Sequence, residues 1–211
     1  MSQCDIDNNQ VCMAMLRIGV ATTVPQGLYC ACEACQNWTW TEPDIVDNMA
    51  LNWYHHWRGD WLIQYRFCEP VMPSERCTDT DQQRVVATVE VDIGGWAPTR
   101  LDIECRCRSG IYFMQGWMLI KETFWKYDYV CDRPRCKPKE PCVKRYLARS
   151  STHTVGFRFT CSCLAGQYCA TEQDERIKTY DIDDSDKQGP FLYGYCRPVS
   201  VVRPASKRSK G

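Results

Sequence analysis

The chain has 211 residues, and its 26 acidic and 26 basic side chains cancel to a net charge of zero. Its 16 cysteines are many for this length and even in number, which is typical of a disulfide framework in an oxidising compartment. No apolar run reaches the length of a membrane span. We expect neither a membrane span nor a nucleic-acid partner.

The N-terminus predicts a mature secreted segment. Met1 is followed by Ser-Gln-Cys, without the basic start and apolar stretch of a signal peptide. The tripeptide Asn37-Trp38-Thr39 is an acceptor sequence for an N-glycan at Asn37, although such tripeptides also arise by chance. We therefore expect an extracellular glycoprotein.

Three segments end alike, with an aromatic-rich strand, a cysteine and a proline. They are YRFCEP at 65–70, YDYVCDRP at 127–134 and LYGYCRP at 192–198. The spacing gives an internal period of about 65 residues. We therefore predict three disulfide-rich β repeats, at 1–70, 71–133 and 134–200, and a basic C-terminal tail at 201–211.

The segments between the cysteines favour strands, and helical periodicity is hard to find. Residues 156–163 alternate, for example, and place Phe157, Phe159 and Cys161 on one face. Each repeat is then about four strands in two hairpins, which makes the chain an all-β protein of three tandem small domains. The predicted strands, in chain order, are 50–57, 61–68, 83–93, 99–107, 156–163, 175–182 and 190–196.

The cysteines divide six, four and six among the repeats, and none is left over. Counting back from each C-x-C pair, the middle repeat lacks its second cysteine, near Val86, and its fifth, at Phe113. A bridge should gain or lose both of its cysteines together, because a lone thiol in a secreted protein is reactive. The second and fifth cysteines should therefore be partners, as Cys12–Cys35 and Cys142–Cys169. An apolar Val86–Phe113 contact should replace the missing bridge.

The other cysteines leave two arrangements open. The two side chains of a C-x-C pair on a strand point to opposite faces, so they need different partners, namely the first and last cysteines of the repeat. Sequence does not fix which takes which, and the crossed alternative remains. The favoured pairs are Cys4–Cys30, Cys32–Cys68, Cys77–Cys105, Cys107–Cys131, Cys136–Cys161 and Cys163–Cys196.

No residue pattern of an enzyme or a metal site stands out. The chain has no G-x-S-x-G, no H-E-x-x-H and no glycine-rich phosphate loop, and its histidines are His55, His56 and His153. The cysteines at 30, 32 and 35 could belong to a thiolate cluster, but the even count of bridges explains them better. We predict no catalytic residues, no metal and no cofactor.

All eight tryptophans lie in the first two repeats. A small unit has little room to bury so many, so some should cover a neighbouring repeat or face a protein partner. Our predicted ligand-binding residues are Trp53, Tyr54, Trp57, Trp61, Trp96 and Trp117.

Two further patterns indicate other partners. Arg58-Gly59-Asp60 lies at a predicted hairpin tip and could dock in an integrin, although a tight turn also uses glycine there. Basic residues crowd the start of the third repeat and could attract heparan sulfate, unless they form only a solvated loop. These residues are Arg133, Arg135, Lys137, Lys139, Lys144 and Arg145.

Tandem units with a C-x-C-x5-C core, as at Cys161, Cys163 and Cys169, resemble the Argos (giant-lens) family. The resemblance implies three stacked disulfide-rich β domains, loosely like three-finger receptor ectodomains. It also implies a clamp that sequesters an EGF-like growth factor and blocks receptor signalling. The alternatives are an adhesion or matrix protein that uses the Arg-Gly-Asp or basic residues, and a receptor ectodomain.

Overall fold

We describe the chain from a computed structural model. Within its described residues no helix is long and apolar enough to cross a membrane. The side chains of residues 22–24, 26 and 55 are not described. The described residues are 2–5, 9–18, 22–36, 38–55, 61–95, 98–148, 153–170 and 191–198.

Nearly all regular structure in the described residues is β-strand, as predicted. One four-residue helix, α1 (Glu33–Gln36), and one 3-10 turn, η1 (Asp79–Asp81), complete it. Repeat one, two and three below denote the predicted segments 1–70, 71–133 and 134–200. The strands are β1 (Val11–Ile18), β2 (Thr22–Leu28), β3 (Ala50–His55) and β4 (Trp61–Phe67) in repeat one; β5 (Ala87–Asp92), β6 (Arg100–Ile103), β7 (Ile111–Ile120) and β8 (Phe124–Val130) in repeat two; and β9 (Pro141–Leu147), β10 (Thr154–Phe159), β11 (Gln167–Cys169) and β12 (Phe191–Pro198) in repeat three.

Each repeat has the same strand order. The orders are β2-β1-β4-β3, β6-β5-β8-β7 and β10-β9-β12-β11. In each repeat the first strand of the first strand pair therefore lies beside the last strand of the second pair. Predicted strands 50–57, 61–68, 83–93, 99–107, 156–163 and 190–196 each overlap a strand, while 175–182 lies outside the described residues. The predicted alternation also holds, because Phe157, Phe159 and Cys161 are buried and Arg158 between the two rings is exposed.

The eight disulfides all join cysteines of one repeat. They match the favoured pairing, so the crossed alternative is wrong for this structure. The first bridge has nearly the same Cα–Cα separation in each repeat, at 4.9, 5.0 and 4.9 Å. The pairs are Cys4–Cys30, Cys12–Cys35, Cys32–Cys68, Cys77–Cys105, Cys107–Cys131, Cys136–Cys161, Cys142–Cys169 and Cys163–Cys196.

A small parallel bridge beside the first disulfide also recurs three times. The residue before the first cysteine pairs with the residue inside the C-x-C, as Gln3↔Ala31, Arg76↔Arg106 and Arg135↔Ser162. This backbone bridge holds the entry of each repeat against the segment that follows the second strand of its first hairpin. Strand order, first disulfide and backbone bridge thus recur in all three segments.

The middle repeat replaces its missing bridge differently from the prediction. Val86 is fully buried in the core cluster and its amide donates to the Tyr129 carbonyl at 2.9 Å. Phe113 is not among the described residues packed on that cluster, and its ring lies 5.2 Å from the ring of Tyr54 in repeat one. The predicted Val86–Phe113 contact is therefore wrong. Phe113 joins two repeats instead, because alternation along β7 turns it away from the core that buries Tyr112 and Met114.

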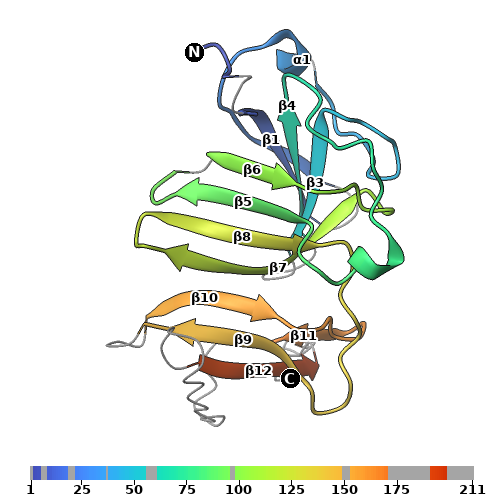
Figure 1. Cartoon of the computed structure of the whole chain (residues 1–211), viewed down its shortest axis with the longest axis vertical. Coiled ribbons are helices and arrows are strands. Elements are labelled where there is room, and N and C mark those ends of the chain that lie inside the picture. The colour runs from blue at the N-terminus through green and yellow to red at the C-terminus, as the bar shows by residue number, and fades with distance from the viewer. Residues whose placement is uncertain are drawn as a thin grey trace, which may run out of the picture.

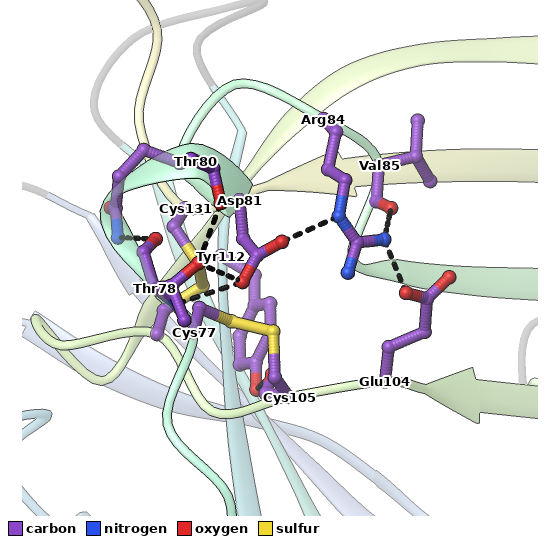
Figure 2. The surroundings of a disulfide bond; sticks show 12 residues. Cys77, Thr78, Thr80, Asp81, Arg84, Val85, Glu104, Cys105, Tyr112 and Cys131 are labelled. Carbon is purple, nitrogen blue, oxygen red and sulfur yellow. Dashed lines mark hydrogen bonds and ion pairs between the residues drawn. A yellow bond between two sulfur atoms is a disulfide. The ribbon is translucent and has the colours of Figure 1, made fainter.

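A polar network holds the segment that lost its cysteine. Figure 2 shows Thr78 directing its backbone N–H and its hydroxyl at the Asp81 carboxylate, at 2.8 and 2.6 Å. Arg84 then pairs with Asp81 at 2.7 Å and with Glu104, the residue that follows β6. Exposed ion pairs stabilise only weakly, so burial of Val86 contributes more than this network.

The three repeats join into one sheet through a single strand. The free edge of β7 pairs with β3 in parallel at Ile111–Phe113, and with β10 in antiparallel at Gly116–Met118. In Figure 1 repeat one lies at the top, repeat two in the middle and repeat three at the bottom. The β7 strand thus makes both strand pairings between repeats, and the chain has one continuous framework.

Candidate ligand-binding site

Aromatic side chains fill the contact between repeats one and two. Trp53 on β3 is fully buried, and its ring centroid lies 4.1 Å from that of Tyr129 and 5.3 Å from that of Tyr112. The Tyr112 hydroxyl donates to the Cys105 carbonyl at 2.9 Å, so the buried phenol has its partner. Burial raises the pKa of the Tyr112 hydroxyl, which keeps it neutral.

A buried amide pair closes the same contact. Gln64 exchanges two hydrogen bonds with the Thr41 backbone, at 2.7 and 3.0 Å, and donates to the side-chain oxygen of Asn52. Asn52 in turn donates to the Gly110 carbonyl of repeat two, at 3.2 Å. A Cβ at Gly110 would lie 1.9 Å from the Pro43 carbonyl oxygen, so only glycine allows this approach.

The contact between repeats two and three is also aromatic. Trp117 on β7 lies edge-on to Trp125 at 5.0 Å and to Phe157 of repeat three at 5.1 Å. Glycines let the two backbones approach. A Cβ at Gly116 would lie 2.4 Å from the Phe157 carbonyl oxygen, and one at Gly156 2.7 Å from that of Trp117.

These contacts correct two of the predicted ligand-binding residues. Trp53 is fully buried and Trp117 is 8 % exposed, so both cover a neighbouring repeat and neither offers a surface to a partner. The inter-repeat alternative that the sequence left open is right for them. Tyr54 and Trp61 remain partly exposed, on β3 and β4. Outside the described residues lie Trp57, Trp96, Asn37 and Arg58-Gly59-Asp60.

The predicted polyanion residues do not form one row. Lys144 lies over the rings of Phe191 and Tyr193, with its Nζ 4.7 and 5.7 Å from their centroids, and Arg145 lies 6.0 Å over Phe157. Lys137 and Lys139 belong to the short loop before β9. Of the six residues, Arg133 and Arg135 line a cavity.

That cavity, here the junction pocket, lies where the three repeats meet. It has a volume of about 400 Å³. Tyr54 comes from repeat one, Phe113 from repeat two, the connecting segment 132–135 from the boundary of repeats two and three, and Ser162 with Cys163 from repeat three. The aromatic pair of Tyr54 and Phe113 forms an apolar wall.

Charge in the junction pocket comes from two arginines and one aspartate. Arg135 donates to the Cys163 carbonyl at 3.0 Å, which fixes its position. Arg133 is 6 % exposed and lies 5.0 Å over the Phe159 ring. Burial lowers the pKa of its guanidinium to about 10, against the opposing effects of Tyr54 and Asp132, so the group stays cationic at neutral pH.

A second cavity, of about 290 Å³, lies between repeats two and three beside Trp117 and Phe157. It also contains Asp128, whose carboxylate is 3.8 Å from the Lys126 ammonium. Burial raises the pKa of Asp128, although Lys126 and Arg158 oppose the shift. The Oδ1 of Asp128 is buried without a hydrogen-bond partner within the described residues, but Lys126 and Arg158 line the same cavity and oppose its charge. The junction pocket, whose Arg133 has no such counter-charge in an ion pair with the described residues, is therefore the better candidate for a ligand.

Sequence reasoning singled out Tyr54, Arg133 and Arg135 but missed their proximity. It also missed Phe113, Asp132 and Ser162 as pocket residues. Phe113 had a usable signal, because an aromatic residue in place of a structural cysteine points to a new contact. Close triads of cysteine sulfurs do occur, but every one of these cysteines is in a disulfide and offers no thiolate to a metal.

Fold and pocket together define a disulfide-stapled all-β protein of three joined repeats. No protein-family model and no curated protein matches the chain. Among solved structures, the chain is similar to the crystal structure of unliganded Argos, with 16 % identity and a TM-score of 0.39. The match covers 94 % of this chain and 92 % of that chain. Argos is also the family that the cysteine pattern of the sequence resembles.

Proposed function

We propose that the chain is a secreted, non-enzymatic binding protein that sequesters an extracellular growth factor, of the EGF-like class, and blocks receptor signalling. The observation that carries this proposal is the junction pocket, in which all three repeats contribute to one concave, aromatic and cationic surface. The eight disulfides support a secreted location, because such bridges persist in oxidising compartments.

Rigidity favours tight capture of a ligand. Each disulfide removes conformations from the unfolded chain and contributes about 2–4 kcal/mol to stability. The shared edge of β7 fixes the repeats relative to one another. Little ordering entropy then opposes binding, and partly exposed aromatic side chains such as Tyr54 and Trp61 can contact the partner.

Surface plasmon resonance with the refolded, fully oxidised protein tests this proposal. Purified EGF-like growth factor domains would be passed over it, with EGF-like modules of matrix proteins as controls. We expect submicromolar binding of at least one growth factor, and a matching loss of receptor phosphorylation when the protein is added to responsive cells. Absence of binding across the panel, or binding without loss of phosphorylation, would contradict the proposal.

An adhesion function is the second candidate. Strands β3 and β4, which flank the Arg-Gly-Asp tripeptide in the sequence, are paired antiparallel up to His55↔Trp61. Replacing Asp60 with Glu should abolish integrin-dependent cell adhesion if this candidate is right, and should leave growth-factor capture intact. Strong retention on heparin without a protein ligand would instead favour a heparan sulfate partner.

A further inference from the structure

The junction pocket contains a buried cation, Arg133, whose guanidinium forms no ion pair with a carboxylate of the described residues. The guanidinium of Arg133 makes no hydrogen bond or ion pair within the described residues, and its Nε is a buried nitrogen without a partner. The Phe159 ring stabilises the cation from one face only. Buried polar groups are normally paired, because an unpaired charged donor costs more than a neutral one.

Three other arginines of the described chain, at 17, 66 and 84, have the carboxylate partner that Arg133 lacks. Arg66 pairs with Asp47, Arg17 with Glu42 at 2.7 Å, and Arg84 with Asp81 and Glu104. The carboxylate next to Arg133 in the chain, that of Asp132, accepts the backbone N–H of Arg133 at 2.8 Å. Within the described residues, the buried guanidinium of Arg133 therefore lacks a carboxylate partner.

We propose that the junction pocket binds a carboxylate of the captured protein, presented by an acidic side chain, with Arg133 as the residue that pairs with it. This inference rests on the proposed function. The planar guanidinium fork matches a carboxylate with two parallel hydrogen bonds. A volume of about 400 Å³ also leaves room for an apolar neighbour of the acidic residue against the rings of Tyr54 and Phe113.

A sulfated glycan fits the pocket less well. Arg133 and Arg135 against Asp132 leave one net positive charge, whereas polyanions bind through several clustered cations. The other basic residues of repeat three lie elsewhere, with Lys144 and Arg145 over aromatic rings. A single carboxylate with an apolar neighbour fits one buried guanidinium between aromatic walls.

Nuclear magnetic resonance of the Arg133 Nε–Hε group tests the pocket without the growth factor. The oxidised wild-type protein would be titrated with acetyl-Phe-Glu-amide, acetyl-Phe-Gln-amide and sodium sulfate at constant ionic strength. We expect a saturable shift with the glutamate peptide, at least tenfold weaker binding of the glutamine peptide, and no saturation with sulfate. Equal binding of both peptides, tighter binding of sulfate, or an unmoved Arg133 signal would overturn the inference.

Variants then connect the pocket to growth-factor capture. Loss of a charged hydrogen-bond partner should weaken binding by about tenfold to a hundredfold in Arg133→Met. The matched control Arg84→Met removes an exposed arginine that already has two carboxylate partners, and should stay within about twofold. If Arg133→Met does not regain all eight bridges, Arg133→Lys keeps the charge without the fork and should still weaken binding by several-fold.

The two proposals fail in different ways. If no growth factor binds the wild-type protein, the proposed function is wrong, and the peptide titration still decides whether the pocket takes a carboxylate. If a growth factor binds equally well to the wild-type protein and to Arg133→Met, the proposed function stands and the carboxylate pocket is wrong.

Discussion

At the scale of single residues, Gln64 has an unusual position for an amide. It is fully buried, and its side chain satisfies both the N–H and the carbonyl of Thr41 and one oxygen of Asn52. The segment that contains Thr41 has no strand of its own, so this amide replaces the missing strand partner. One side chain thus holds a long connection of repeat one against the sheet.

Replacing Gln64 with Leu should lower the free energy of unfolding by about 2–4 kcal/mol, because two backbone groups lose their partners at about 1–3 kcal/mol each and only part of this is regained by the apolar side chain. Denaturant unfolding of the oxidised protein measures this loss. Gln83→Leu, at an exposed position, is the control and should change stability by less than about 0.5 kcal/mol. Equal effects of the two variants would show that Gln64 has no special role.

The carboxyl group of Asp81 should make the stability of the fold depend on pH in the acidic range. Hydrogen bonds from Thr78, and then from Arg84, lower the pKa of its carboxyl from 3.8 to about 2 (Figure 2). A carboxyl with a lowered folded-state pKa stabilises the protein fully above its unfolded value, and this contribution is lost as the pH falls through the folded value. Asp81→Asn should therefore melt below the wild type at pH 6, and the gap should narrow between about pH 4 and pH 2.

Scanning calorimetry at a series of pH values checks the Asp81 prediction. Thr78→Val removes the main donor to the carboxylate, so in that background Asp81→Asn should cost less at pH 6 than it does in the wild type. A melting difference that stays constant down to pH 2 would contradict the assignment.

At the scale of elements, two glycines decide how closely β7 and β10 approach. A methyl group at Gly116 would collide with the Phe157 carbonyl, and one at Gly156 with the Trp117 carbonyl. Gly116→Ala should therefore separate the strands and cost about 1–3 kcal/mol of stability. In β2, where a Cβ at Gly27 would meet only ordinary contacts of 3.4 Å or more, Gly27→Ala should be neutral or mildly stabilising. The denaturant midpoints of the two variants measure this difference in stability. Similar midpoints would show that stability does not require the close approach of β7 and β10.

Much of the element scale could be predicted from the sequence. Cysteines are lost in pairs, so spacing alone identified the Cys12–Cys35 and Cys142–Cys169 bridges. Alternating residues located strands such as β10. The prediction of a Val86–Phe113 contact was wrong because the spacing of cysteines does not indicate which face of β7 a substituted residue occupies. Gly116 and Gly156 lie within the observed strands β7 and β10, and a glycine within a strand is a signal for close backbone approach that the sequence analysis did not use.

At the scale of the whole molecule, the joining of the repeats could not be predicted. Each repeat ends in a free strand edge, and nothing local marks the edge of β7 as the one that receives both β3 and β10. The parallel pairing with β3 spans only Asn52–Tyr54, so it depends on side-chain packing around Trp53 rather than on strand propensity. The same lack of local information hid the junction pocket, whose residues come from all three repeats.

Trp53 therefore couples repeats one and two, and its removal should destabilise both. Trp53→Ala deletes a fully buried indole and should cost about 3–5 kcal/mol. Because Tyr112 and Tyr129 lose a ring neighbour, amides of β7 and β8 in repeat two should lose hydrogen-exchange protection together with those of β3. The control Trp61→Ala alters a partly exposed side chain on β4, so its effect should stay within repeat one. Loss of protection confined to repeat one in both variants would mean that the repeats unfold independently and that the shared edge of β7 does not couple them.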